Sequence, residues 1–138
     1  MDSLAMLDQI NKDLPPFIKL LGIKFTSVSD DQLEAEMFVR DDMITPRDTC
    51  HGGALMSFAD TMGAFSTIAN MPVGASTLTM ESKTNFLRAA PLGQTLRGVC
   101  SAVHKGRRTQ VWRTEIFRED GKLVAVVTQT QMVIAAAG

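Results

Sequence analysis

The chain has 138 residues, a formal net charge of −1 at pH 7 and 45% hydrophobic residues. This length suits one domain with its own core, and a charge near zero gives no electrostatic basis for binding nucleic acid or an anionic membrane. Its two cysteines, Cys50 and Cys100, exclude a disulfide framework and have no metal-ligand spacing. The N-terminus lacks the basic and apolar regions of a signal peptide, so we expect a soluble, cytoplasmic protein with no membrane span.

The first 40 residues predict helices and then strands. Apolar residues at helical spacing, with Ser3 as N-cap, predict a first helix that Pro15 ends, and a further helical turn completes an N-terminal segment over 1–21. The hydrophobic period then changes to strict alternation, which is typical of half-buried strands. The predicted elements are helices over 3–14 and 17–21 and strands over 23–28 and 32–39.

The segment from Thr49 to Asn70 predicts a long helix that is buried on most sides. Apolar and small residues lie all round its helical wheel, and it contains no proline, lysine or arginine. Asp60 is its only charge, on a stripe with Ser57, Thr61 and Ala64. A lone carboxylate in an apolar helix is costly unless it is paired, exposed at an interface or used in chemistry. Asp60 is therefore the first candidate functional residue.

The rest of the chain predicts strands joined by tight turns. One turn contains Asp120-Gly121, the pair expected in a two-residue hairpin. The predicted strands cover 77–87, 95–104, 109–117 and 123–134. The order of elements predicts a single α+β domain over 1–138, with an antiparallel sheet of five to six strands curled around one long helix. Because that helix is apolar all round, a monomer would expose apolar surface, and we expect a dimer.

Five short motifs follow one another along the chain in an order that is typical of one protein family. They are Thr-Cys-His-Gly-Gly over 49–53, Phe-Ala-Asp-Thr over 58–61, Asn-Phe-Leu-Arg over 85–88, Gly-Arg-Arg-Thr over 106–109 and Leu-Val-Ala over 123–125. Together they resemble the hotdog-fold thioesterases, in particular the PaaI-like branch of the 4-hydroxybenzoyl-CoA thioesterase superfamily. The resemblance runs from about Gly22 to Ile134, and the acidic residue nine positions after the histidine makes it specific.

The resemblance implies hydrolysis of an acyl-CoA thioester to a carboxylic acid and CoA, with no metal or organic cofactor. Asp60 would act as nucleophile or as general base on water, and Gly52 would offer its N–H to polarise the thioester carbonyl. The first N–H groups of a helix have no intrahelical partner and carry partial positive charge, which suits a developing oxyanion. His51 completes the candidate catalytic set, and we expect it to orient the loop or cap backbone rather than act as the base.

The spacing of Gly52 and Asp60 has a consequence for assembly. Eight residues along one helix correspond to about 12 Å. A carbonyl bonded to Gly52 therefore cannot be attacked by Asp60 of the same helix, and each site needs antiparallel helices from two subunits. We expect an obligate homodimer, arranged as a dimer-of-dimers tetramer.

Residues for substrate binding follow from the same resemblance. The turn from Lys105 to Arg108, with Arg88, would bind the phosphates of CoA, although a solvated basic turn is an open alternative. The family often has asparagine and glycine six and three residues before the histidine, where this chain has Thr45 and Asp48. The full set of candidate substrate contacts is Thr45, Gly53, Thr61, Thr79, Arg88, Lys105, Gly106, Arg107 and Arg108.

Other interpretations remain open. Asp60 as a structural carboxylate would bond to neighbouring hydroxyls such as Ser57 or Thr61. Cys50 beside His51 invites a nucleophile–base reading, but adjacent side chains rarely meet, so we interpret Cys50 as packing. A non-catalytic acyl-CoA binding or sensing protein would keep the basic turn without needing Asp60. A hotdog dehydratase is disfavoured because its loop motif is missing.

Overall fold

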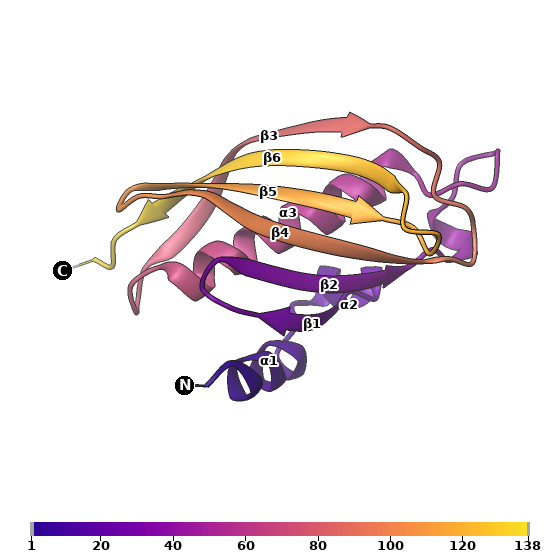
Figure 1. The fold of residues 1–138 in the computed structure, drawn as a ribbon. Coiled ribbons are helices and arrows are strands. Elements are labelled where there is room, and N and C mark those ends of the chain that lie inside the picture. The colour runs from indigo at the N-terminus through magenta and orange to yellow at the C-terminus, as the bar shows by residue number, and fades with distance from the viewer. Residues whose placement is uncertain (1, 138) are drawn as a thin grey trace.

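The computed structural model describes residues 2–137 and shows a curled sheet wrapped over one long helix (Figure 1). The helices are α1 (Ser3–Lys12), α2 (Pro16–Leu21) and α3 (Gly52–Asn70), with a 3-10 turn at Asp41–Met43. The strands are β1 (Lys24–Val28), β2 (Gln32–Phe38), β3 (Ser76–Phe86), β4 (Thr95–Lys105), β5 (Thr109–Phe117) and β6 (Leu123–Ile134). The predicted elements are confirmed, with small shifts at their ends.

The sheet has six antiparallel strands in the order β1-β2-β4-β5-β6-β3. Strand β3 follows α3 in the chain and pairs with β6, so it forms one edge of the sheet, and β1 forms the other. The pairing of β3 with β6 runs over the whole strand and shifts register between Thr79 and Glu81. The two edge strands also differ in length, with five residues in β1 and eleven in β3.

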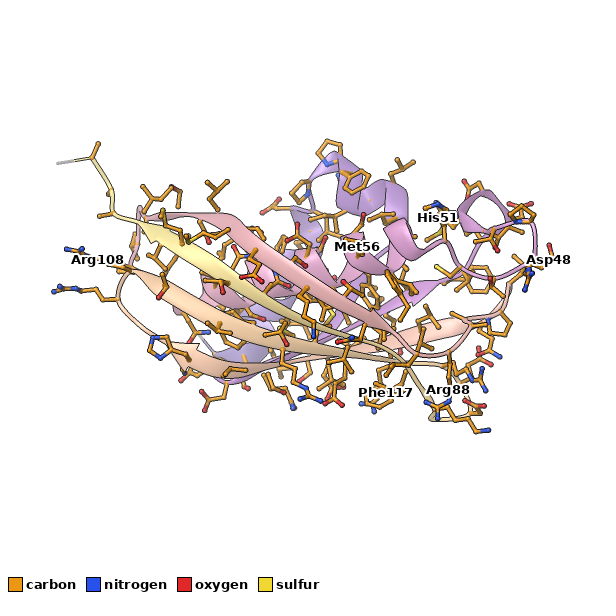
Figure 2. The ribbon with its side chains drawn as sticks, turned by 90° about the horizontal axis from the view of Figure 1, so that it is seen from above. Asp48, His51, Met56, Arg88, Arg108 and Phe117 are labelled. Carbon is orange, nitrogen blue, oxygen red and sulfur yellow. The ribbon has the colours of Figure 1, made fainter. Side chains whose placement is uncertain are left out.

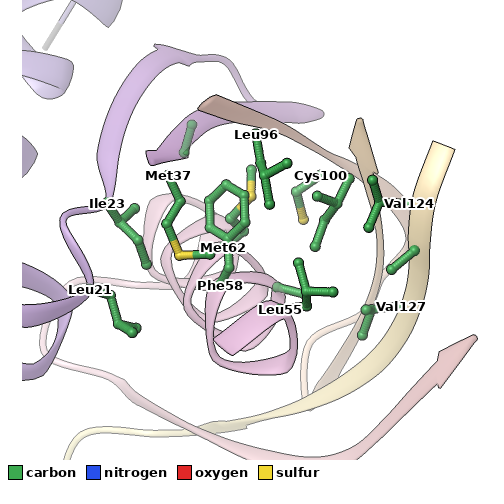
Figure 3. Packing of buried hydrophobic residues seen from close by; sticks show 14 of the residues in the cluster. Leu21, Ile23, Met37, Leu55, Phe58, Met62, Leu96, Cys100, Val124 and Val127 are labelled. Atoms are coloured by element: carbon green, nitrogen blue, oxygen red, sulfur yellow. The ribbon is translucent and has the colours of Figure 1, made fainter. Parts of the chain in front are cut away.

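Helix α3 packs closely against the concave face of the sheet. Phe58 and Met62 are completely buried there, among the apolar side chains of Figure 3. Gly98 on β4 lies directly opposite, and a Cβ added to it would lie 2.3 Å from Met62 Sδ and 2.9 Å from Phe58 Cζ. The missing side chain therefore allows the helix to approach the sheet. Burial of each large side chain contributes about 1.5–3 kcal/mol to stability.

One face of α3 is not covered by the sheet. Met56, Asp60, Ala64 and Ile68 follow one another at four-residue spacing, and the sheet leaves Met56 40% and Ile68 47% exposed. Of the predicted stripe, Thr61 is buried, so the open face follows the line of Met56 and Asp60 instead. Asp60 thus lies in the middle of an open, otherwise apolar helix face. No helix within residues 2–137 is long and apolar enough to cross a membrane.

The N-terminal segment covers the β1 edge. The N-cap of α1 is Asp2 rather than the predicted Ser3, because the Asp2 side chain accepts from the N–H of Ala5 at 2.8 Å. At the other end of α1, the Asn11 amide donates to the carbonyl of Phe25 at 2.9 Å and accepts from its N–H at 3.0 Å. This side chain binds the backbone of β1 as a neighbouring strand would.

Candidate active site

The histidine and the two glycines form the beginning of α3. His51 is the N-cap, and its Nδ1 accepts a hydrogen bond from the N–H of Gly53 at 2.8 Å. A Cβ on Gly53 would lie 2.9 Å from Nδ1, so a larger residue would disturb this cap. The predicted capping role of His51 is confirmed. Figure 2 shows His51 and Met56 on the helix, on the side away from the sheet.

Gly52 is the first residue of α3, and its N–H has no hydrogen-bond partner within residues 2–137. It lines a pocket of about 370 Å³ that also includes Leu55 and the chain from Phe86 to Ala90. The Phe86 ring, at the end of β3, would lie 3.2 Å from a Cβ placed on Gly52. The partial positive charge of the helix terminus is therefore available to a carbonyl oxygen bound beside β3.

The turn before the helix uses its polar groups internally. The Thr45 hydroxyl lies 3.0 Å from the Thr49 hydroxyl and accepts from the N–H of Arg47 at 3.3 Å. Asp48 has φ of 57°, the left-handed conformation that glycine adopts most readily and aspartate tolerates. This conformation accounts for the glycine that the family often places there. Thr45 thus supports the turn in this structure.

Asp60 is half-buried and is held from the sheet rather than from its own helix. Its Oδ1 accepts from the Thr79 hydroxyl of β3 at 2.8 Å and from Gln129 Nε2 of β6 at 3.3 Å. The expectation that a structural Asp60 would bond to Ser57 or Thr61 is wrong, because the hydroxyls of these two residues donate to helix carbonyls at 2.8 and 2.7 Å. Thr79, a predicted substrate contact, therefore binds the carboxylate itself.

Two glutamines behind Asp60 were not predicted from the sequence. Gln131 donates to the Thr79 hydroxyl at 2.6 Å and accepts from the Thr77 hydroxyl at 2.9 Å. Gln129 and Gln131 are 1% and 0% exposed. The available signal was their position, since both occupy the inward-facing alternation of β6 with Val127. Buried amides need partners, and here the partners lead to Asp60.

The two cysteines are poor nucleophiles in this environment. Burial raises the pKa of the Cys50 thiol to about 11, and burial also raises the pKa of the Cys100 thiol. A thiol must ionise to attack, so Cys50 stays protonated near pH 7 although it adjoins His51. Both cysteines are buried and free. The interpretation of Cys50 as a packing residue agrees with this environment.

The predicted basic residues do not converge within one subunit. Figure 2 shows Arg88 and Arg108 at opposite ends of the sheet. Arg88 donates to the Leu123 carbonyl at 2.9 Å, beside the Gly52 pocket. In the β4–β5 turn, Lys105 pairs with Asp31 at 2.5 Å, and the N–H of Gly106 bonds to the Thr109 carbonyl at 2.9 Å.

Arg107 and Arg108 are exposed and line a cavity of about 720 Å³ at the same end. Its remaining wall is mainly apolar and includes Met80 of β3 and Met132 of β6. An apolar wall beside two guanidinium groups suits a ligand that carries both an apolar part and anionic groups. Of the four basic candidates, these two are therefore placed best for phosphate.

The fold and these motifs define the class of protein. The model of the thioesterase superfamily matches residues 48–125, which include α3 and most of the sheet, and the chain belongs to this family. It is a thioester hydrolase.

Individual relatives agree with this assignment. The chain is 36% identical over 106 residues to 1,4-dihydroxy-2-naphthoyl-CoA hydrolase of Escherichia coli (strain K12), covering 77% of each chain. It is 35% identical over 105 residues to the proofreading thioesterase EntH of Cronobacter turicensis, covering 76% of each. Among solved structures it matches the E. coli PaaI protein of the phenylacetic acid degradation operon with a TM-score of 0.86, at 27% identity, over 98% of this chain and 99% of that one. The predicted PaaI-like hotdog thioesterase fold is confirmed.

Proposed function

We propose that the protein is a homodimeric acyl-CoA thioesterase in which each active site combines Asp60 of one subunit with the Gly52 N–H of the other. One observation carries this proposal. Asp60 is anchored to Thr79 near the start of the edge strand β3, whereas the Gly52 N–H, which has no partner among residues 2–137, lies beside Phe86 at the end of the same strand. Neither group completes a site by itself.

Antiparallel pairing of β3 with the same strand of a second copy would bring the two groups together. In the register that places Thr79 opposite Phe86 of the partner subunit, Asp60 approaches the partner's helix N-terminus. The same register places Leu78, which is 60% exposed, opposite Leu87, which is 51% exposed. It also turns the open faces of the two α3 helices toward each other. An isologous interface of this kind generates two identical sites.

The chemistry follows from these positions. The Gly52 N–H donates to the thioester carbonyl and stabilises the oxyanion that forms on it. Asp60 either attacks the carbonyl carbon or removes a proton from an attacking water. With Asp60 as base, the water oxygen adds to the carbonyl carbon, the C–S bond breaks, and the proton taken up by Asp60 passes to the CoA thiolate. With Asp60 as nucleophile, cleavage of the C–S bond leaves a mixed anhydride on Asp60; water hydrolyses it to the carboxylic acid and the free Asp60 carboxylate, and the released proton neutralises the CoA thiolate.

Acyl-CoA as the substrate class has two supports. The E. coli relative is a CoA-thioester hydrolase by name. In this chain, Arg107 and Arg108 lie at the end of the sheet that holds the start of β3 and therefore on the side of Asp60. In the dimer, a CoA phosphate bound there and a thioester bound at the partner's Gly52 belong to one continuous ligand.

The first test measures CoA release from a panel of aryl, short-chain and long-chain acyl-CoAs by the wild type and by Asp60→Asn. We expect Asp60→Asn to lower kcat by roughly 10²- to 10⁴-fold, the usual range for loss of a general acid or base. Equal rates for the two proteins would overturn the role of Asp60. Tight binding without turnover of any thioester would favour the sensor instead.

The second test separates a shared site from a site within one subunit. Gly52→Pro removes the N–H at a helix position that tolerates proline, and Gly52→Ala adds a Cβ but keeps the N–H. Co-refolding inactive Asp60→Asn and Gly52→Pro chains gives mixed dimers with one intact site. We expect about a quarter of wild-type activity to return at equal mixing, because half of the dimers are mixed and each has one site of two. No recovery would contradict the shared site.

A further inference from the structure

The carboxylate of Asp60 is held asymmetrically. Both of its donors, the Thr79 hydroxyl and Gln129 Nε2, bind Oδ1, at 2.8 and 3.3 Å. Within residues 2–137, Oδ2 has no hydrogen-bond partner. A carboxylate tethered through one oxygen keeps a fixed rotamer and presents the other oxygen. Since Asp60 lies on the open face of α3 and is only partly buried, Oδ2 is the oxygen left free of the sheet contacts that hold Oδ1.

Gln129 has no evident structural reason to be an amide. It is 1% exposed, and its Nε2 also reaches the Asp60 carbonyl at 3.4 Å. Its Oε1 is buried without a hydrogen-bond partner among the described residues. A buried amide that is satisfied on one side only gives the fold little net stabilisation. Its Nε2 group instead donates to Asp60, the one charged residue of α3.

The helix leaves space for this amide. A Cβ on Gly63 would lie 2.2 Å from Gln129 Cδ and 2.3 Å from its Nε2. The glycine one turn after Asp60 therefore allows Gln129 to extend beneath the helix to the carboxylate. Thr79 is held by a hydrogen bond, since its hydroxyl accepts from the buried Gln131 at 2.6 Å. Both donors to Oδ1 are thus fixed from the sheet side.

We infer that Gln129 and Thr79 are positioning residues that anchor Oδ1 of Asp60, so that Oδ2 is the oxygen that acts on the thioester or on water. This inference rests on the proposed thioesterase site and assigns its internal geometry. Neither residue contacts the substrate. Both act through Asp60, and their removal lowers the fraction of time that Oδ2 points at the carbonyl without changing how CoA binds.

The principal test uses Gln129→Met, which keeps the length of the side chain and removes the amide. We expect kcat to fall roughly tenfold, equivalent to about 1.4 kcal/mol, with KM within twofold of wild type. The matched control is Gln110→Met, another buried glutamine on the sheet, whose Oε1 accepts from Trp112 Nε1 at 3.0 Å and which does not contact Asp60. It is expected to retain wild-type kcat.

Thr79 provides an independent test with its own rescue. Thr79→Val removes the hydroxyl at nearly constant shape, and we expect a loss in kcat of roughly tenfold or more, since it gives the shorter bond. Thr79→Ser restores a hydroxyl and should recover most of the rate. The double variant with Gln129→Met should lose less than the product of the two single losses, because both act on one carboxylate.

Gly63→Ala adds a third route to the same contact. Its methyl group displaces the Gln129 amide, so it should lower kcat in the wild type but change it little in a Gln129→Ala background.

The outcomes separate this inference from the proposed function. Wild-type kcat in Gln129→Met and Thr79→Val, with Asp60→Asn inactive, would overturn the positioning role and leave the thioesterase intact. Loss of kcat in Gln110→Met as large as in Gln129→Met, or failure of Thr79→Ser to rescue, would also overturn it. If Gln129→Met does not fold, the Thr79 pair alone decides. Full activity of Asp60→Asn would instead remove the proposed function.

Discussion

The two edges of the sheet are protected by different means. The β1 edge is only five residues long, α1 packs against it, and the Asn11 side chain bonds both backbone groups of Phe25. At the β3 edge, eleven residues pair on one side only, and Leu78 and Met80 are more than half exposed. A long apolar edge is a liability for a monomer unless a partner covers it. The fold therefore closes one edge within the chain and leaves the other open, which is the edge that the proposed dimer would cover.

The difference also distributes the functional groups. Lys105, at the end of β4, is paired with Asp31 of the β1–β2 turn. The Gly52 N–H lies beside the end of β3 and the Asp60 carboxylate near its start, while Arg107 and Arg108, in the β4–β5 turn, line a cavity that includes Met80 of β3. In the proposed dimer, the β1 edge contributes to stability and the β3 edge forms the active site, and each of the following predictions addresses one side of that contrast.

The largest effect is expected from like charges on the β3 edge. In the proposed register, Leu78→Lys with Leu87→Lys places two lysines opposite each other at two points of the interface, which destabilises cross-strand pairing. We expect monomers in sedimentation and a loss of more than about 100-fold in kcat/KM, because each site loses half its groups.

The matched control places opposite charges at the same two positions. Leu78→Lys with Leu87→Glu aligns each lysine with a glutamate of the partner, so dimer and activity should largely return. If both double variants remain dimeric and active, the β3 interface is wrong.

The next effect concerns the basic turn. Arg107→Ala with Arg108→Ala removes the exposed guanidiniums, and we expect KM for acyl-CoA to rise roughly tenfold with kcat nearly unchanged. The corresponding acyl-pantetheine substrates, which lack the nucleotide, should be unaffected. Lys105→Ala is the control, since Lys105 is already paired. A rise in KM for Lys105→Ala as large as that for the double arginine variant would indicate a general charge effect.

At the closed edge, the expected effect is on stability. Asn11→Ala leaves the N–H and carbonyl of Phe25 without their side-chain partner and should cost about 1–2 kcal/mol of unfolding free energy for the two lost hydrogen bonds. The measurement is urea unfolding, with Gln9→Ala on the same helix as control. The kcat should not change. A fall in kcat with unchanged stability would contradict the purely structural role of this edge.

The smallest effect concerns Cys50, which lines the Gly52 pocket near the end of β3. Because burial raises its pKa to about 11, labelling by a thiol reagent should be slow at pH 7 and accelerate as the pH approaches 11. The buried Cys100 should also resist labelling, and a Cys50→Ala chain identifies the responding thiol. Rapid labelling of Cys50 at neutral pH would show that the pocket wall opens.

The sequence predicted what depends on local pattern. Alternation identified the strands, because most have one buried face, and the run around His51-Gly52-Gly53 identified the start of the helix. It could not show which hydroxyl would hold Asp60. Ser57 and Thr61 are the neighbours by helical spacing, but serine and threonine hydroxyls in a helix bond its own carbonyls. Thr79 becomes the partner only because β3 returns beside α3 on the far side of β6.

The same limit applies to the basic residues and the glutamines. Arg88 and the Lys105–Arg108 turn were grouped by charge, but β4 lies between them in the chain and its length places them at opposite ends of the sheet. Gln129 and Gln131 stand at inward positions of β6, which marks them as unusual. Their partners, however, depend on how α3 crosses the sheet.

The depth at which α3 lies is set by two absent side chains. Gly98 on the sheet admits Met62 and Phe58, and Gly63 on the helix admits Gln129, so Asp60 sits between two points of close approach. A methyl group at either point would lift the helix from the sheet and, in the dimer, move the two α3 helices toward each other. In the proposed dimer, the width of an acyl channel between the subunits would therefore depend partly on core residues that do not contact the substrate, and substitutions in the core would change the acyl preference.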